Sequence, residues 1–142
     1  MNYKNPWIIN KFVLPQHTDH AGVMWHGTYL NWLEEARIDA LSKAGMKYNN
    51  IISKGYELPV INLEITYKFP IFLGDIIRIN SQFKINKGPR INIESNFIDK
   101  NNNLMTNANI NLVLIKKDNF SIVKHRPDFL LQTFNQLNKG PD

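Results

Sequence analysis

The segment from His17 to His26, HTDHAGVMWH, holds three of the four histidines in the chain and one aspartate. Imidazole and carboxylate groups serve as metal ligands, general bases and nucleophiles, and zinc is commonly bound by three such side chains and a water molecule. In extended backbone, however, His17 and Asp19 would point to one side and His20 to the other. No later cluster of histidine or acidic residues completes a ligand shell. The spacing therefore disfavours a metal site, and we expect neither a metal nor another cofactor.

The same segment precedes a predicted helix, and Gly22 and Gly27 allow the backbone there to turn tightly. N–H groups at the start of a helix are free to face a ligand, and together with the helix dipole they stabilise an oxyanion. A lone carboxylate such as that of Asp19 acts as a base or a nucleophile toward an acyl carbon. The segment therefore favours a site that cleaves an acyl bond. The alternative is that its histidines only line a surface loop.

Two strongly patterned segments flank this loop. Trp7 to Leu14 is rich in β-branched and aromatic residues and stops at Pro15, which predicts a first strand. From Gly27 to Ala44, good helix formers carry apolar residues at three-to-four spacing and Gly45 follows as a stop, which predicts a long helix. The apolar stripe is broad, so this helix is expected to pack against a sheet along its whole length.

The rest of the chain predicts four more strands joined by short turns, followed by a final helix. From Glu57 to Phe69 apolar and polar residues alternate, as is typical of a half-buried strand. The next three strands are predicted by the alternating sets Ile77, Ile79, Phe83 and Ile85; Ile91, Ile93 and Phe97; and Leu104, Ala108, Ile110, Leu112 and Leu114. Pro127 suits the first turn of the final helix. A long helix on a five-stranded antiparallel sheet is an α+β fold, and its uncovered sheet surface predicts association with other copies of the chain.

Length and composition define the class of protein. The 142 residues suit one domain, residues 1–142, and 43% hydrophobic with 20% charged residues is typical of a globular chain. The absence of cysteine excludes thiolate nucleophiles, disulfides and cysteine-bound zinc, and it fits the cytoplasm. There is no signal-peptide pattern and no run of about 18 apolar residues, so we expect a soluble protein with no membrane partner.

The net charge of +5 comes from 17 lysines and arginines against 12 aspartates and glutamates. This excess favours an anionic partner, such as nucleic acid or a phosphate-bearing small molecule or carrier. The basic residues are spread along the chain and form no compact run of the kind found in nucleic-acid-binding arms. We therefore expect a phosphate-bearing ligand and no nucleic acid.

The run HTDHAGVMWHGTYLNWLEEAR resembles the signature of 4-hydroxybenzoyl-CoA thioesterase-like proteins, a family with the hotdog fold. The residues in register with that signature are Thr18, Asp19, Gly22, Val23, Trp25, His26, Tyr29, Trp32, Glu35, Ala36 and Arg37. The predicted order of one strand, a long helix and four strands is also the hotdog order, so the resemblance covers nearly the whole chain. It implies hydrolysis of an acyl-CoA or acyl-carrier-protein thioester between the subunits of a homo-oligomer, either a dimer or a dimer of dimers (a homotetramer).

The resemblance implies catalytic roles for two residues. Asp19 occupies the place of the family's carboxylate, which either attacks the thioester carbonyl to form a mixed anhydride or activates water. The backbone amide of His26 occupies the place of the donor that polarises the carbonyl, while its imidazole either lines the acyl pocket or has no role. His17 replaces an acidic residue of the signature, and it either interacts with Asp19 or is exposed.

The resemblance also implies substrate contacts from the loop, from the strand expected to line the acyl pocket, and from the turn expected to bind coenzyme A phosphates. These positions are Gly22, Trp25, Pro59, Val60, Lys84, Lys87 and Arg90. Trp25, like Tyr29 and Trp32, is also a candidate for packing in the core or in the dimer. For the whole chain, the alternative to an enzyme is a non-catalytic acyl-binding protein on the same fold.

Overall fold

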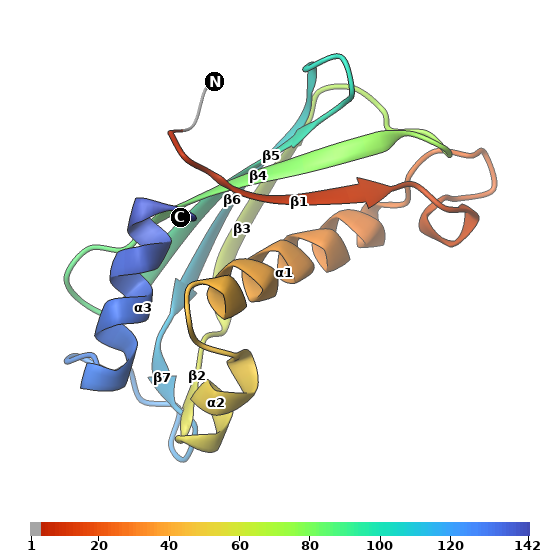
Figure 1. Ribbon diagram of the computed structural model, residues 1–142. Coiled ribbons are helices and arrows are strands. Elements are labelled where there is room, and N and C mark those ends of the chain that lie inside the picture. Colours follow the sequence, from red (N-terminus) through yellow and green to blue (C-terminus); the bar gives the residue numbers. More distant parts are fainter. Residues whose placement is uncertain (1–3) are drawn as a thin grey trace.

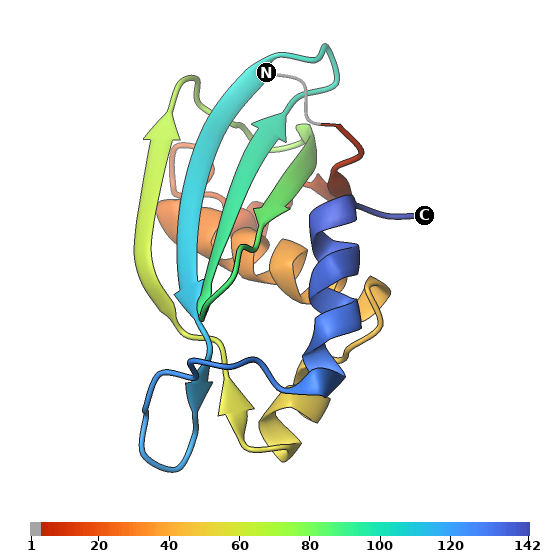
Figure 2. The same ribbon diagram turned by 90° about the vertical axis from the view of Figure 1, so that its left-hand side faces the viewer.

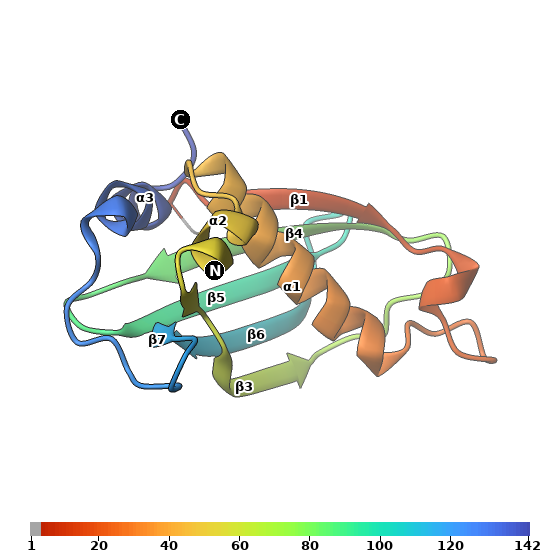
Figure 3. The ribbon, with the colours of Figure 1, turned by 90° about the horizontal axis from the view of Figure 1, so that it is seen from below.

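The computed structural model describes residues 4–142, and its centre is a five-stranded antiparallel sheet with one long helix across it (Figure 1). In spatial order the strands are β1 (Trp7–Phe12), β4 (Ile76–Lys84), β5 (Arg90–Ile98), β6 (Leu104–Val113) and β3 (Val60–Tyr67). Helix α1 (His26–Lys43) lies against one face of this sheet (Figure 3). The predicted α+β architecture is confirmed.

The core lies between α1 and the sheet, because alternate side chains of the central strands point toward the helix. Ile79 of β4 and Phe97 of β5, for example, pair across the two strands and are fully buried. The buried apolar residues of α1 follow a helical spacing and are Tyr29, Trp32, Leu33, Ala36, Ala40 and Leu41. The outer face of the sheet is polar, with Asn92 donating to both Asn109 and Asn111. Within residues 4–142 no helix crosses that outer face (Figure 2).

A group of short elements lies at the end of the molecule away from the start of α1 (Figure 1). It consists of α2 (Tyr48–Ser53), β2 (Tyr56–Glu57), β7 (Ile115–Lys116) and α3 (Asp128–Lys139). α3 follows Pro127, as predicted, and docks through Asn138, whose side chain bonds the backbone N–H and the carbonyl of Ile85, each over 2.7 Å. At the opposite end a single 3-10 turn, η1 (Pro15–His17), joins β1 to the loop before α1.

Two predictions for the segment from Glu57 to Phe69 are wrong. The segment does not form one strand, because Pro59 lacks an N–H for a sheet ladder and Glu57 pairs with Ile115 in the separate β2–β7 ribbon. The remaining strand, β3, is not half-buried either. It is an edge strand next to β6, and α1 packs nearer β1 and β4, so Val60 and Leu63 stay 46% and 38% exposed.

Other differences concern where elements end. β1 ends at Phe12 rather than Leu14, and α1 covers His26–Lys43 rather than Gly27–Ala44. The six residues of α2 and the two-residue strands were not predicted, because such short elements show no measurable period. No helix in residues 4–142 has the length and apolar content that a membrane span requires.

Candidate functional site

The loop between β1 and α1 forms a tight, self-bonded turn around Asp19. The Asp19 N–H donates to the Val23 carbonyl over 2.8 Å, and the Gly22 N–H donates to the Asp19 carbonyl over 3.1 Å. Gly22 has φ +77°, a left-handed conformation that glycine adopts without strain. The turn therefore depends on a glycine at position 22. Asp19 is the first residue of this turn.

The two oxygens of the Asp19 carboxylate have different surroundings. Oδ1 accepts hydrogen bonds from the N–H of Ala21 over 2.8 Å and from the N–H of Val23 over 3.2 Å. No donor within residues 4–142 reaches Oδ2, and the residue as a whole is exposed. One oxygen therefore holds the side chain in place while the other remains available for chemistry.

The Asp19 loop is also tied to the segment between β3 and β4. The Met24 N–H donates to the Ile71 carbonyl over 2.7 Å, and the Leu73 N–H donates to the Gly22 carbonyl over 3.0 Å. Ile71 is fully buried, so this clamp is anchored in the core. The loop is thus a fixed part of the fold, held on both sides by backbone hydrogen bonds.

Helix α1 begins immediately after the loop and presents free donors there. The first helical residues are His26 and Gly27, and neither N–H has a hydrogen-bond acceptor in residues 4–142. The carbonyl of His17 orients this helix start by accepting from the Trp25 N–H and the Thr28 hydroxyl, both over 2.9 Å. Unpaired N–H groups at a helix N-terminus stabilise negative charge. The predicted position of the His26 amide, at the start of the long helix, therefore suits an oxyanion donor.

Trp25 covers this helix start from outside. Its ring lies 5.1 Å from the His26 ring, centroid to centroid, and it folds back over Gly27 so closely that a Cβ on Gly27 would collide with it. The side chain is 48% exposed, so the alternative that placed Trp25 in the core is wrong. Tyr29 and Trp32, in contrast, are buried as expected.

A pocket of about 310 Å³ opens between the loop, the start of α1 and the end of β3. Its lining residues are Val23, Met24, His26, Tyr29, Tyr67, Lys68, Phe69 and Pro70. Val23 connects the pocket to Asp19 through the two hydrogen bonds described above. The walls are mainly apolar and aromatic, as in sites that bind the apolar part of a small molecule.

Five of these lining residues, Met24 and the four from Tyr67 to Pro70, were not predicted as site residues from the sequence. The alternation of residues placed Tyr67 and Phe69 on the buried side of a strand, whereas both are exposed at the mouth of the pocket. The available signal was the Pro70 that follows them, since proline marks the end of a strand and the start of a loop.

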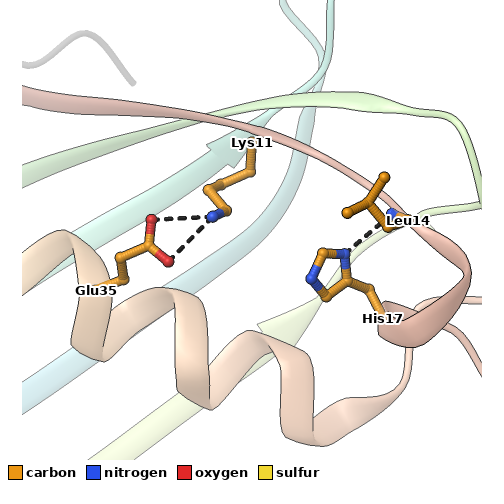
Figure 4. A network of polar contacts seen from close by, with 4 residues as sticks. All are labelled: Lys11, Leu14, His17 and Glu35. Atoms are coloured by element: carbon orange, nitrogen blue, oxygen red, sulfur yellow. Dashed lines mark hydrogen bonds and ion pairs between the residues drawn. The ribbon is translucent and has the colours of Figure 1, made fainter.

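His17 has a structural role that differs from both expectations. Its Nδ1 accepts a hydrogen bond from the Leu14 N–H over 3.0 Å (Figure 4). Its ring packs edge-on against Trp32, with centroids 5.2 Å apart. The side chain is half-buried, and none of its hydrogen bonds involves Asp19. Figure 4 also shows Lys11 of β1 bonded to both carboxylate oxygens of Glu35, at 3.0 and 2.9 Å, which ties α1 to the sheet. Across residues 4–142 no three histidine or acidic side chains converge as a metal site would require.

A family model described as the Thioesterase-like superfamily matches residues 13–132, which include the loop, α1 and every strand of the sheet except β1. The chain belongs to the Thioesterase-like superfamily.

Two relatives match about half of this chain in sequence. The protein sll0410 of Synechocystis sp. is 43% identical over 72 residues, 51% of this chain and 43% of the relative. The 1,4-dihydroxy-2-naphthoyl-CoA hydrolase of Crocosphaera subtropica is 31% identical over 72 residues, 50% of this chain and 53% of that enzyme. The matched region thus spans about half the length of these two relatives.

A solved structure extends the comparison. The DHNA-CoA thioesterase of Staphylococcus aureus is 28% identical and superposes with a TM-score of 0.76, over 82% of this chain and 78% of that enzyme. The shared architecture confirms the hotdog fold implied by the resemblance.

Within one chain of this Thioesterase-like protein, the other predicted substrate-binding residues lie far from the Asp19 loop. They are Pro59, Val60, Lys84, Lys87 and Arg90. Tyr67, at the loop end of β3, lies roughly 23 Å along the strand from Val60 at the other end. Val60 lines a second pocket of about 190 Å³, together with Leu30, Leu33, Glu34, Arg37, Leu63 and Ile110. Pro59 precedes Val60, where its carbonyl accepts from the Val113 N–H over 3.2 Å.

The basic turn is even further from the loop. β4 begins at Ile76, next to the loop, and ends at Lys84 roughly 26 Å away. Lys87 lies in the turn that follows, and Arg90 is the first residue of β5. Of the predicted site residues, the structure therefore brings together Asp19, Gly22, Trp25 and His26, and it leaves the other five at a distance.

Proposed function

We propose that the chain hydrolyses acyl thioesters of coenzyme A or of an acyl carrier protein at the pocket beside Asp19. The observation that carries this proposal is the asymmetry of the Asp19 carboxylate. Oδ1 is fixed by the N–H groups of Ala21 and Val23, while Oδ2 has no donor within residues 4–142, and the residue is exposed. A positioned carboxylate oxygen with no competing partner is what a general base or a nucleophile requires.

Two routes lead from this geometry to the same products. In the first, Asp19 Oδ2 attacks the carbonyl carbon and expels the thiolate, and water then cleaves the mixed anhydride to release the acid and restore the carboxylate. In the second, Oδ2 takes a proton from water as the water oxygen attacks the carbonyl carbon. The C–S bond then breaks, and the same proton passes from Oδ2 to the leaving sulfur, which gives the free acid and the thiol and restores the carboxylate. In both routes the His26 N–H, at the start of α1, stabilises the charge that develops on the carbonyl oxygen.

The pocket supports acyl groups that contain a flat ring. Tyr29, Tyr67, Phe69 and His26, all with ring side chains, are among its lining residues, and aromatic pairs prefer stacked or edge-on contacts. The relatives from Staphylococcus aureus and Crocosphaera subtropica are named for a bicyclic aromatic acyl-CoA. Aromatic acyl-CoA thioesters are therefore the first substrates to test.

The distance between the Asp19 loop and the basic turn supports a homo-oligomer. If Lys84, Lys87 and Arg90 bind the phosphates of a thioester held at Asp19, a second copy has to supply them. β3 offers an unpaired strand edge for such a contact, with Val60 and Leu63 exposed beside it. We propose a dimer or a dimer of dimers that acts in the cytoplasm, with residues 1–142 as one domain.

The alternative function is acyl binding without turnover. It is favoured by the structural role of Asp19 Oδ1, since holding the loop is by itself a reason for an aspartate at this position.

Release of free thiol from a panel of aromatic and short-to-long aliphatic acyl-CoAs and acyl-carrier-protein esters separates the two functions. We expect turnover of one class of ester by the full chain. Calorimetric binding of those esters with no thiol released would contradict the enzyme and support the acyl-binding protein.

A further inference from the structure

The Thr106 hydroxyl is a buried polar group without a partner. Thr106 lies on β6 with none of its surface exposed, and its Oγ1 has no hydrogen-bond partner in residues 4–142. A hydroxyl that is removed from water and left unpaired costs free energy, so such groups call for an explanation.

Thr106 lies directly beneath Tyr29. In the sheet, Thr106 pairs with Tyr67 of β3 on one side and with Phe97 of β5 on the other. The Tyr29 ring lies 4.9 Å from the Tyr67 ring and 5.4 Å from the Phe97 ring, centroid to centroid. Tyr29 therefore bridges the two neighbours of Thr106 and covers the residue between them.

The hydroxyl of Tyr29 is electrically neutral and partly desolvated. Burial raises the pKa of Tyr29 above its ordinary value of 10.0, and the nearby Thr106 hydroxyl lowers it only in part. The contact between the two hydroxyls falls short of hydrogen-bonding geometry, as the unpaired Oγ1 of Thr106 indicates. At neutral pH both groups therefore carry a proton that they can donate.

Tyr29 is also part of the inner wall of the pocket beside Asp19. Among the lining residues only Met24 and Tyr29 are buried, at 4% and 3% exposed, while His26, Tyr67 and Phe69 lie at the mouth. Met24 offers no hydrogen-bond donor, so Tyr29 supplies the polar group of this inner wall.

We propose that Tyr29 is a specificity residue that hydrogen-bonds an oxygen substituent of the acyl group, and that Thr106 is the residue that positions it. This inference rests on the proposed thioesterase function. When the Tyr29 O–H donates to the substituent, the Thr106 O–H donates to the Tyr29 oxygen, and both hydroxyls are satisfied. The pocket thus favours a hydroxylated or oxo-substituted acyl group over the same group without that oxygen, because the unsubstituted group leaves the Tyr29 O–H without an acceptor.

The test compares benzoyl-CoA with 4-hydroxybenzoyl-CoA, which differ by one oxygen. Wild type is expected to prefer the hydroxylated ester in kcat/KM, and Tyr29→Phe is expected to reduce that preference at least about tenfold. Thr106→Val keeps the shape of the side chain and is expected to weaken the preference mainly by raising KM for the hydroxylated ester. The control is Tyr56→Phe, on β2 away from the pocket, which should leave the preference as it is in wild type.

The two esters differ in intrinsic reactivity, but this difference is the same for every variant. It therefore cancels when the ratio of their kcat/KM values is compared between a variant and wild type. If Tyr29→Phe and Thr106→Val slow both esters equally, or leave the ratio unchanged while wild type turns over both, the role of Tyr29 is overturned and the thioesterase function stands. If wild type turns over no thioester of any class, the thioesterase function is lost and this inference is lost with it. Thr106→Val gives an independent reading should Tyr29→Phe fail to fold.

Discussion

Asp19 and Val23 are joined by two hydrogen bonds that run in opposite directions. The Asp19 N–H donates to the Val23 carbonyl over 2.8 Å, and the Val23 N–H donates to Asp19 Oδ1 over 3.2 Å. Since Val23 also lines the pocket, the same residue pair closes the loop and fixes the carboxylate at the edge of the site. The Asp19 side chain therefore both stabilises the loop and carries the proposed reactive carboxylate. Different substitutions at Asp19 can separate these two roles.

The first prediction separates the structural role of Asp19 from its charge. Asp19→Asn keeps an oxygen at the Oδ1 position, whereas Asp19→Ala removes the acceptor for both Ala21 and Val23. We expect Asp19→Ala to lower the free energy of unfolding by about 1–2 kcal/mol and Asp19→Asn by less than about 0.5 kcal/mol. Urea unfolding measures both. Equal losses in the two variants would show that Oδ1 does not stabilise the loop.

The second prediction concerns the left-handed backbone of Gly22. A Cβ at this position meets no atom within 4 Å, so Gly22→Ala is strained only by φ, at a cost of about 1–2 kcal/mol. Gly55, at φ +91°, is equally open and lies far from the pocket, which makes Gly55→Ala a matched control. We expect similar losses of stability in both variants but a fall in thiol release only for Gly22→Ala. Equal activities would mean that the geometry of the loop is irrelevant to turnover.

The third prediction concerns the contact between Trp25 and Gly27. Gly27→Ala places a methyl group where the indole ring lies, and because that ring is half exposed it can swing into solvent. We expect the free energy of unfolding to change by less than about 1 kcal/mol, since alanine also favours the helix. Trp7 and Trp32 are buried, so greater quenching of fluorescence by acrylamide would report the release of Trp25. Unchanged quenching together with unchanged KM would indicate that Trp25 does not cover the site.

The fourth prediction concerns assembly through the free edge of β3. Leu63→Lys places a charge among exposed apolar residues of that edge and should convert an oligomer to monomers in sedimentation experiments, with loss of thiol release. Ile122→Lys alters an equally apolar, exposed residue outside the sheet and should have neither effect. A wild-type chain that is monomeric and fully active would contradict the shared site.

The sequence placed some candidate site residues together better than others. Asp19, Gly22 and His26 are close along the chain, so their common position in the loop and at the helix start could be predicted, while their catalytic roles stay a prediction from the family resemblance. The alternation in β4 and β5 was equally informative, because both strands are covered by α1 on one side only. Lys84 and Val60 could not be placed, since their distance from Asp19 follows from the direction of whole strands in the sheet.

The burial of β3 could not be predicted from the sequence, for a different reason. Its residues alternate like those of a half-buried strand, but the strand lies at the edge of the sheet, where α1 does not reach it. A periodic pattern reports which side chains share a face, while burial of that face depends on what packs against it. For that reason we predict that a second copy of the chain packs against the exposed apolar residues of β3.

The most direct test of the proposed function is the turnover number of Asp19→Asn on the best acyl-CoA substrate of the wild type. Asparagine preserves the Oδ1 contacts of the loop but is neither a base nor a nucleophile, so we expect kcat to fall about 10²–10⁴-fold while the substrate still binds. Retention of the wild-type kcat by Asp19→Asn would contradict the catalytic role of Asp19.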